Sequence, residues 1–99
     1  MTPPPRRGEI RRVAGDSGRR VLVYSGNMFN DLPDVPYVIT MEITSVPEPM
    51  DVALADGSRV AYTRLDHLPK SLLGDRVGTV PHEVMEKINT RLFMVLATQ

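Results

Sequence analysis

The 99-residue sequence contains no cysteine and no tryptophan, and its only histidines are His67 and His82. Without cysteine the chain can form no disulfide, no thiolate nucleophile and no cysteine-based zinc site. The two histidines lie far apart in the sequence and form no metal-ligand motif. We therefore expect a protein that uses no metal ion and no other cofactor.

Long apolar runs are also absent. The longest one, residues 92–97, is much shorter than the roughly 18 apolar residues that a membrane-spanning helix needs. The arginines near the start precede no apolar stretch, so the sequence shows no secretory signal. These features predict a cytoplasmic protein that has no contact with a membrane. The length fits one domain, with residues 1–5 as a flexible, proline-rich tail and residues 6–99 as the folded part.

The net charge is zero, but the charges are distributed unevenly along the chain. Residues 1–20 have an excess of arginine, residues 21–58 carry acidic groups and no lysine or arginine, and residues 59–99 have a small basic excess. If the first part folds beside the third, the two would form a local basic surface that can hold phosphate groups. The alternative, which charge alone favours, is that these groups are scattered and only keep the protein soluble.

Most of the sequence has the pattern of short β-strands. Residues 21–24 form a continuous β-branched and aromatic run typical of a buried central strand, and residues 37–44 alternate in the manner of a half-buried strand. Two further alternating runs flank Asp56 and Gly57, a pair that predicts a hairpin with a two-residue type I′ turn. The polar, proline-containing stretch 27–36 is expected to be a loop.

Shorter strands are predicted at residues 8–14 and 75–80. From Pro81 onwards apolar residues recur at spacings of three and four, which predicts an amphipathic C-terminal helix. The residues of its apolar face are Val84, Met85, Ile88, Leu92, Val95 and Leu96. Together these elements predict a mainly β fold: a small, partly closed β-barrel or rolled sheet, with the C-terminal α-helix covering one open side.

The sequence contains none of the usual motifs of phosphate-binding loops, serine nucleophile elbows or zinc proteases. Any chemistry must therefore use ordinary polar side chains. The order of several segments, however, resembles the MazF/PemK toxin family over about residues 6–97. The segments that carry the resemblance are Arg6 to Ile10, Arg19 to Ser25 followed by Asn27 to Asn30, Val38 to Ser45, and Asp75 to Val80 leading into a helix with Met85, Lys87 and Ile88.

This resemblance implies an SH3-like, partly open β-barrel of the CcdB/PemK type that forms a homodimer. Members of the family are metal-independent endoribonuclease toxins, which cleave single-stranded mRNA at short specific sequences. In their reaction the ribose 2′-hydroxyl attacks the adjacent phosphate, and the products are a 2′,3′-cyclic phosphate and a 5′-hydroxyl. A cognate MazE-like antitoxin inhibits them by placing its acidic tail in the RNA groove. The resemblance therefore implies single-stranded RNA and an antitoxin as partners of this chain.

The catalytic residue that the resemblance implies most strongly is an arginine just before the second strand. In the family a proline usually follows it; here the aligned arginine is Arg19, and Arg20 occupies the place of the proline. We expect Arg19 to be catalytic, because a fixed guanidinium stabilises the extra negative charge of a pentavalent phosphorane. Since no proline fixes the register, Arg20 is the alternative, and it is otherwise expected to bind RNA. Without the resemblance, both would be interpreted as solvated loop charges.

A second family position is the hydroxyl residue that closes the third strand. It corresponds to Thr44 here, which is expected to bind the scissile phosphate, with Ser45 beside it as an RNA contact. Some members use an acid in the loop before the arginine as general base, and Asp16 is the only acid in this loop. By themselves, Thr44 would be a strand-end cap and Asp16 a turn former.

Two more residues are candidate RNA contacts. His67 lies near the fifth strand, and histidine is the usual side chain for proton transfer near neutral pH. Phe29, in the long polar loop, is the candidate for stacking on a base, although its alternative role is to anchor that loop to the core. An Arg and an Asp that another subgroup of the family uses on the fifth strand are expected to be missing, since Ala61 and Thr63 occupy the aligned positions.

The alternative function is a non-catalytic or gyrase-directed, CcdB-like toxin that binds a protein through the same barrel. The enzyme hypothesis needs at least two of Asp16, Arg19 and Thr44 to face one groove. The binding hypothesis does not depend on where these side chains point. Their placement in the folded chain therefore discriminates between the two.

Overall fold

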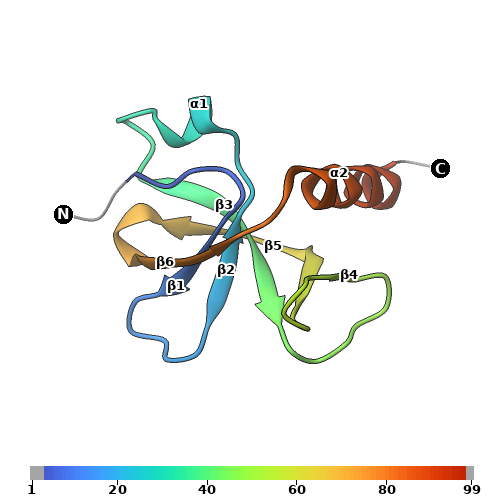
Figure 1. Ribbon diagram of the computed structural model, residues 1–99. Helices are drawn as coiled ribbons and strands as arrows, with labels where there is room; N and C mark the ends of the chain where they lie inside the picture. The colour runs from blue at the N-terminus through green and yellow to red at the C-terminus, as the bar shows by residue number, and fades with distance from the viewer. Residues whose placement is uncertain (1–3, 98–99) are drawn as a thin grey trace.

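The computed structural model describes residues 4–97, which fold into one antiparallel sheet and a C-terminal helix (Figure 1). The elements of this part of the chain are β1 (Glu9–Val13), β2 (Arg20–Val23), α1 (Asn27–Asn30), β3 (Tyr37–Thr44), β4 (Val52–Ala53), β5 (Arg59–Pro69), the 3₁₀ turn η1 (Lys70–Leu72), β6 (Leu73–Thr79) and α2 (His82–Leu96). The strands follow the order β4-β5-β3-β2-β1-β6, and all neighbours are antiparallel. The predicted mainly β fold with a C-terminal helix is confirmed.

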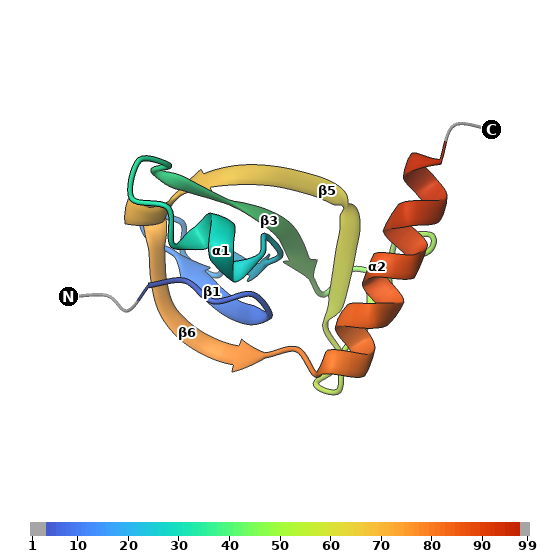
Figure 2. The same ribbon diagram turned by 90° about the horizontal axis from the view of Figure 1, so that it is seen from above.

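The sheet curls because its longest strand, β5, is bulged. Leu65 of β5 pairs with Met41 of β3, but the next β3 residue, Glu42, pairs with Ala61. Extra residues in one strand of a pair bend that strand and increase its twist. Figure 2 shows the result: β5 and β6 curve around β1 and β3, and α2 runs along the side where β5 turns. The sheet therefore forms a partly open barrel.

Apolar side chains pack on both faces of the central strands, because side chains alternate along a strand. Val21 and Val23 of β2 lie on one face, which we call face A, and Leu22 lies on the other, face B. The face A cluster consists of Val13, Val21, Val23, Val38, Leu68 and Leu73. The larger face B cluster, which includes residues of α2, consists of Ile10, Leu22, Met41, Ile43, Val52, Val60, Tyr62, Val80, Met85, Ile88 and Leu92.

The helix α2 covers face B with only part of its apolar side. Met85, Ile88 and Leu92 are buried, as the periodicity predicts. Val95 and Leu96 were expected to be buried too, but they are 44% and 62% exposed. Periodicity identifies the apolar side of a helix, but it does not show where the covered surface ends. Neither helix in residues 4–97 has the length and apolar character needed to cross a membrane.

The predicted type I′ turn between β4 and β5 is wrong. The Leu54 N–H donates to the Ser58 carbonyl at 2.8 Å, so that Ala55, Asp56 and Gly57 form a three-residue loop. The Gly57 N–H donates to the Leu54 carbonyl at 3.1 Å, and Gly57 has a φ of 88° whereas Asp56 has no positive φ. This is the hairpin geometry of a type I turn followed by a left-handed glycine.

The stretch 27–36 is also not entirely a loop, because it begins with the single helical turn α1. The Asn30 N–H donates to the Gly26 carbonyl at 2.9 Å, and the buried Asn30 side chain donates to the Ser25 carbonyl at 2.9 Å. These bonds depend on two residues that meet only in the fold, so composition did not indicate them. At the start of the chain, Pro5 is buried, and residues 1–3 of the predicted tail lie outside the described residues.

Candidate active site

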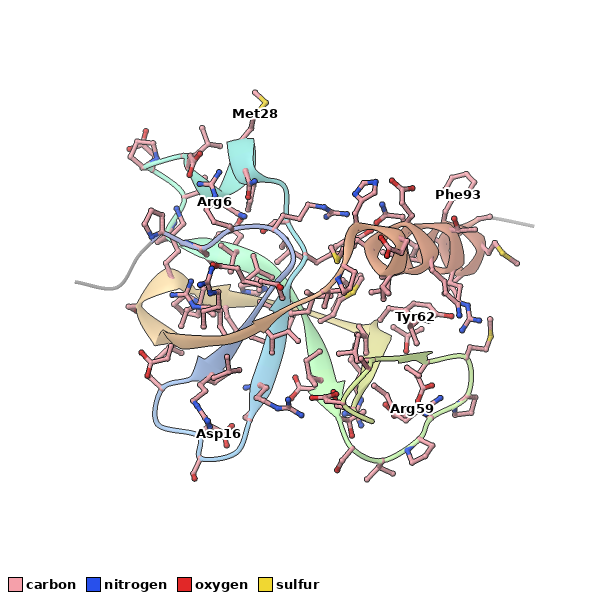
Figure 3. The ribbon with its side chains drawn as sticks, in the orientation of Figure 1. Arg6, Asp16, Met28, Arg59, Tyr62 and Phe93 are labelled. Atoms are coloured by element: carbon pink, nitrogen blue, oxygen red, sulfur yellow. The ribbon has the colours of Figure 1, made fainter. Side chains whose placement is uncertain are left out.

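Arg19 lies at the end of the β1–β2 loop, immediately before β2. This loop is tight: the Asp16 N–H donates to the Val13 carbonyl at 3.2 Å, and the Arg19 N–H donates to the Asp16 carbonyl at 3.1 Å. Gly15 and Gly18 have φ values of 79° and 83°, a conformation that glycine adopts far more readily than other residues. Figure 3 shows Asp16 in this loop, at the lower end of the molecule. The loop backbone therefore holds Arg19 in a defined position at this end.

The Arg19 guanidinium is surrounded by three carboxylates from separate parts of the chain. Its Nε and Nη2 donate to Oε1 and Oε2 of Glu42, on β3, at 3.0 and 3.1 Å. Asp16 Oδ2 lies 3.8 Å from Nη1, and Asp66 Oδ2, on β5, lies 3.8 Å from Nη2. The hydrogen bonds to Glu42, opposed in part by burial, raise the pKa of Arg19 above its usual value. The guanidinium is therefore a permanent positive charge.

Thr44 ends β3 on the same face as Arg19. The register pairs Arg20 with Ile43, so Arg19 and Thr44 are the next cross-strand neighbours, and such neighbours share a face of the sheet. The Val46 N–H donates to Thr44 Oγ1 at 3.1 Å, which fixes the oxygen and leaves the hydroxyl proton to donate elsewhere. The structure thus places Arg19, Asp16 and Thr44 together at one end of face A.

The strand β5 adds a second arginine beside Thr44. Arg59 is the register partner of Thr44, and its Nε donates to Oδ2 of the buried Asp51 at 2.6 Å. Figure 3 shows Arg59 near β4, at the same end of the molecule as Asp16. Bonds from the Glu48 N–H and then from Arg59 lower the pKa of Asp51 below its usual value. Arg59 therefore holds the loop before β4 against the end of the sheet.

Arg20 points to the opposite side of the sheet from Arg19, because the two are neighbours near the start of one strand. Its Nη1 lies 3.6 Å from Asp56 Oδ2, and it lines a cavity of about 280 Å³ with residues that include Leu54 and Val77. Arg19, and not Arg20, thus shares a face with Thr44. Ser45, which follows Thr44, is exposed.

Phe29 and His67 lie on either side of Tyr37. The ring centres of Phe29 and Tyr37 are 6.0 Å apart and those of Tyr37 and His67 are 5.2 Å apart, both in edge-to-face geometry. The first contact holds α1 against β3, which is the anchoring role considered for Phe29. His67 pairs with Ile39, so it lies on face B, opposite to Thr44. Figure 1 shows α1 and the β1–β2 loop at opposite ends of the barrel. The structure does not bring these two candidates to Arg19.

Arginines of the basic first segment are paired with acids of the acidic middle segment. Arg6 lies 2.6 Å from Asp31, and Arg19 and Arg20 contact acids of β3 and the β4–β5 turn. The first segment does lie beside the third, since β1 pairs with β6. The expected phosphate-binding surface is therefore interrupted by carboxylates, and a guanidinium offers a phosphate only the edge that its carboxylate leaves uncovered.

Sequence reasoning missed Glu42, Arg59 and Asp66. The alternation of residues 37–44 contained a signal for Glu42, because it puts Glu42 and Thr44 on the same side of the strand. No comparable signal existed on β5, where the bulge decides which residues reach face A. The strand lacks the family residues at positions 61 and 63, but it supplies an arginine and an aspartate from other positions. Within residues 4–97, no group of three or more His, Asp or Glu side chains is arranged to hold a metal ion.

The fold and this polar site define a small, partly open β-barrel with a guanidinium and a hydroxyl at one end of its central strands. The profile of the PemK-like, MazF-like toxins of type II toxin-antitoxin systems matches residues 6–96. The chain therefore belongs to this family. No curated protein matches the chain by sequence.

Several solved structures share this fold. An endoribonuclease in complex with its cognate antitoxin, from a mycobacterial species, is 29% identical with a TM-score of 0.80, and the match covers 96% of this chain and 95% of that one. A second mycobacterial endoribonuclease is 27% identical with a TM-score of 0.81, over 97% of this chain and 94% of that one. A MazE-MazF complex from Deinococcus radiodurans is 18% identical with a TM-score of 0.83, over 98% and 100%, and this likeness concerns the fold alone.

Proposed function

We propose that this protein is the endoribonuclease toxin of a type II toxin-antitoxin pair. Its family and its similarity to two mycobacterial endoribonucleases support RNA cleavage as the reaction. The observation that carries the proposal in this chain is the juxtaposition of Arg19 and Thr44. A permanently charged guanidinium and a hydroxyl with an available proton are cross-strand neighbours at the ends of β2 and β3.

In the proposed reaction the scissile phosphate of RNA binds between these two groups. The ribose 2′-oxygen attacks the phosphorus, the bond to the 5′-oxygen breaks, and the products are a 2′,3′-cyclic phosphate and a 5′-hydroxyl. The phosphorane that forms on the way carries extra negative charge, which the Arg19 guanidinium and the Thr44 hydroxyl stabilise. Each well-placed donor contributes about 10²- to 10³-fold in rate. The reaction proposed here needs no metal ion, because the guanidinium supplies the positive charge.

The proposed substrate is single-stranded mRNA, cut at short specific sequences. Arg20, Ser45, Phe29 and His67 remain the proposed RNA contacts outside the catalytic pair, and residues 6–99 the proposed single domain. The proposed partner is a cognate MazE-like antitoxin, which the antitoxin complex of the 29% identical relative supports. The proposed form is a cytoplasmic homodimer, and the exposed apolar last turn of α2, including Phe93, supports association with a second copy.

The test is incubation of the purified protein with a long RNA in the presence of EDTA, beside the Arg19→Ala variant. We expect the protein to cut the RNA at a few sites, to leave 2′,3′-cyclic phosphate ends, and to lose about 10²- to 10³-fold of its rate on Arg19→Ala. Arg12→Ala is the matched control, because Arg12 is an exposed arginine of β1. RNA that stays intact near stoichiometric protein, or equal cleavage by Arg19→Ala, would contradict the proposal.

A further inference from the structure

Glu42 is the carboxylate that lies in closest contact with the proposed catalytic pair. It stands two residues before Thr44 on β3, on the same face, and both of its oxygens accept hydrogen bonds from Arg19. Its side chain is 21% exposed, whereas those of Asp16 and Asp66 are 56% and 53% exposed. Among the acids around Arg19, Glu42 is therefore the one with a defined position.

We propose that Glu42 is the general base that takes the proton of the attacking 2′-hydroxyl. This inference rests on the proposed endoribonuclease function and adds to it the group that activates the nucleophile. The sequence alone predicted Asp16 for this role. The geometry assigns it to a residue of the rigid central sheet instead of a residue of a loop.

The way in which Glu42 holds Arg19 leaves room for the substrate. Glu42 covers the Nε and Nη2 side of the guanidinium, at 3.0 and 3.1 Å. Asp16 and Asp66 approach Nη1 and Nη2 only to 3.8 Å, which is beyond hydrogen-bond length. The edge formed by Nη1 and Nη2 can therefore bind two phosphate oxygens while the other side keeps its carboxylate. One guanidinium then holds the phosphate and the base next to each other.

The remaining candidates for the base are placed less well. Asp16 and Asp66 make no hydrogen bond to Arg19 and are more than half exposed, so nothing in these contacts orients their carboxylates toward a bound phosphate. His67 lies on the opposite face of the sheet and packs against Tyr37. A general base must lie within hydrogen-bond reach of the proton that it removes. Of these groups, Glu42 alone is bonded to the guanidinium that binds the phosphate.

The step is a transesterification that balances without a cofactor. The 2′-hydroxyl proton moves to a carboxylate oxygen of Glu42, and the 2′-oxygen forms a bond to phosphorus. The bond between phosphorus and the 5′-oxygen breaks, and the leaving oxygen takes a proton from solvent water. Glu42 then returns its proton to water, and Arg19 stays charged throughout.

The test measures single-turnover cleavage of an oligoribonucleotide that contains one cleavage site mapped with the wild-type protein. Glu42→Gln keeps an oxygen that can accept from Arg19 but cannot take up a proton in this pH range. We expect it to slow cleavage by about 10²- to 10⁴-fold and to lose the fall in rate that the wild type shows toward acid pH. Asp16→Asn and Asp66→Asn are expected to have smaller effects and to keep that fall. Glu83→Gln, an exposed residue of α2, is the matched control.

Binding of the same oligonucleotide with a single 2′-deoxyribose at the cleaved position separates a base from a merely positioning residue. We expect Glu42→Gln to bind it as tightly as the wild type or more tightly, because one negative charge near the phosphate is removed. If Glu42→Gln weakens binding and slows cleavage by the same factor, Glu42 only positions Arg19 and the proposal is overturned. It is also overturned if Asp16→Asn is the variant that loses the acid fall.

A second variant keeps the proposal testable if Glu42→Gln does not fold. Glu42→Asp retains a carboxylate one methylene further away, and we expect slower cleavage with the same fall toward acid pH. A wild-type rate in Glu42→Asp that no longer responds to acid would overturn the role of Glu42. A wild-type protein that leaves every RNA intact would overturn the proposed function itself, which is a different outcome.

Discussion

Two arginine–glutamate pairs on face A are built from the same groups but differ in burial. Arg11, on β1, is 1% exposed, its Nη1 donates to Glu9 Oε1 at 2.9 Å, and its Nε donates to the Gly74 carbonyl at 2.7 Å. Arg19 has a side chain that is 28% exposed and bonds to Glu42 at the end of the sheet. A buried pair cannot exchange its partner for a ligand, whereas a partly exposed one can.

The partners of the two pairs differ in the same sense. The Glu9 carboxylate also accepts from the Arg6 N–H at 2.8 Å, so with Arg11 it joins the N-terminal segment, β1 and β6. Arg19 is approached by two further carboxylates that stay at 3.8 Å. The first pair is closed by hydrogen bonds to neighbouring segments, and the second keeps one edge open. The same chemistry therefore serves stability in one place and a site in the other.

The largest expected effect breaks the buried pair. Arg11→Met leaves the Glu9 carboxylate buried without its main partner, and we expect it to lower the free energy of unfolding by about 3–5 kcal/mol. Arg19→Met, the matched variant of the open pair, is expected to cost less than about 1 kcal/mol, because partly exposed pairs contribute little. Urea unfolding at neutral pH measures both values. Equal losses would show that burial does not distinguish the two pairs.

Adding Glu9→Gln to Arg11→Met sharpens this prediction. The double variant is expected to recover part of the loss, since it no longer buries a charge without a counter-ion. A double variant that is less stable than Arg11→Met would mean that the lost packing of the arginine side chain, and not the unpaired carboxylate, causes the loss.

The sequence predicted the parts of the fold that depend on local pattern. Residues 37–44 alternate strictly, and β3 has these bounds, because its polar and apolar sides meet different surroundings. Arg11 is the opposite case: an arginine in a strand is expected to be exposed, and only the fold supplies Glu9 and the Gly74 carbonyl that allow its burial. The turn α1 depends in the same way on Ser25 and Asn30, which bond across the loop.

The candidate site was predictable in part for the same reason. Arg19 and Thr44 were identified through the order of segments that resembles the family, and their proximity follows from the pairing of β2 with β3. Glu42 could have been included, since alternation alone places it on the face of Thr44. Asp66 could not, because it reaches Arg19 only through the bulge in β5. Sequence separation gives no measure of such a shift.

A smaller effect tests whether the open pair, and not the buried one, acts with a hydroxyl. Thr44→Val removes the donor beside Arg19, and a hydrogen bond to a charged group contributes about 1.5–3 kcal/mol, or roughly 10- to 150-fold in rate. We expect the cleavage rate to fall by this factor with little change in the melting temperature. Thr63→Val, at an exposed position of β5, is the matched control. An unchanged rate in Thr44→Val would remove Thr44 from the proposed site.

The smallest effect concerns a third pair, Arg59–Asp51, which lies between the other two in exposure: the arginine side chain is 32% exposed and the aspartate 3%. The pKa of Asp51 is lowered in the folded protein, first by the bond from the Glu48 N–H and then by Arg59. A lowered pKa contributes stability that is complete above the unfolded value of 3.8 and is lost as the pH falls below it. The raised pKa of Arg19 has no such effect in this range, because its window begins above 12.5.

We therefore expect Asp51→Asn to lower the melting temperature at neutral pH and to make it less dependent on pH below about pH 4. Asp34→Asn, which removes an exposed carboxylate, is the control for the loss of one charge. Thermal melts at neutral pH and in this acid range measure the difference. Because Arg59 is the register partner of Thr44, a loss of cleavage in Asp51→Asn at neutral pH would mean that this third pair also helps to hold the site, and that the boundary between the structural and the functional arginines lies nearer to β4 than the exposure of Arg19 alone indicates.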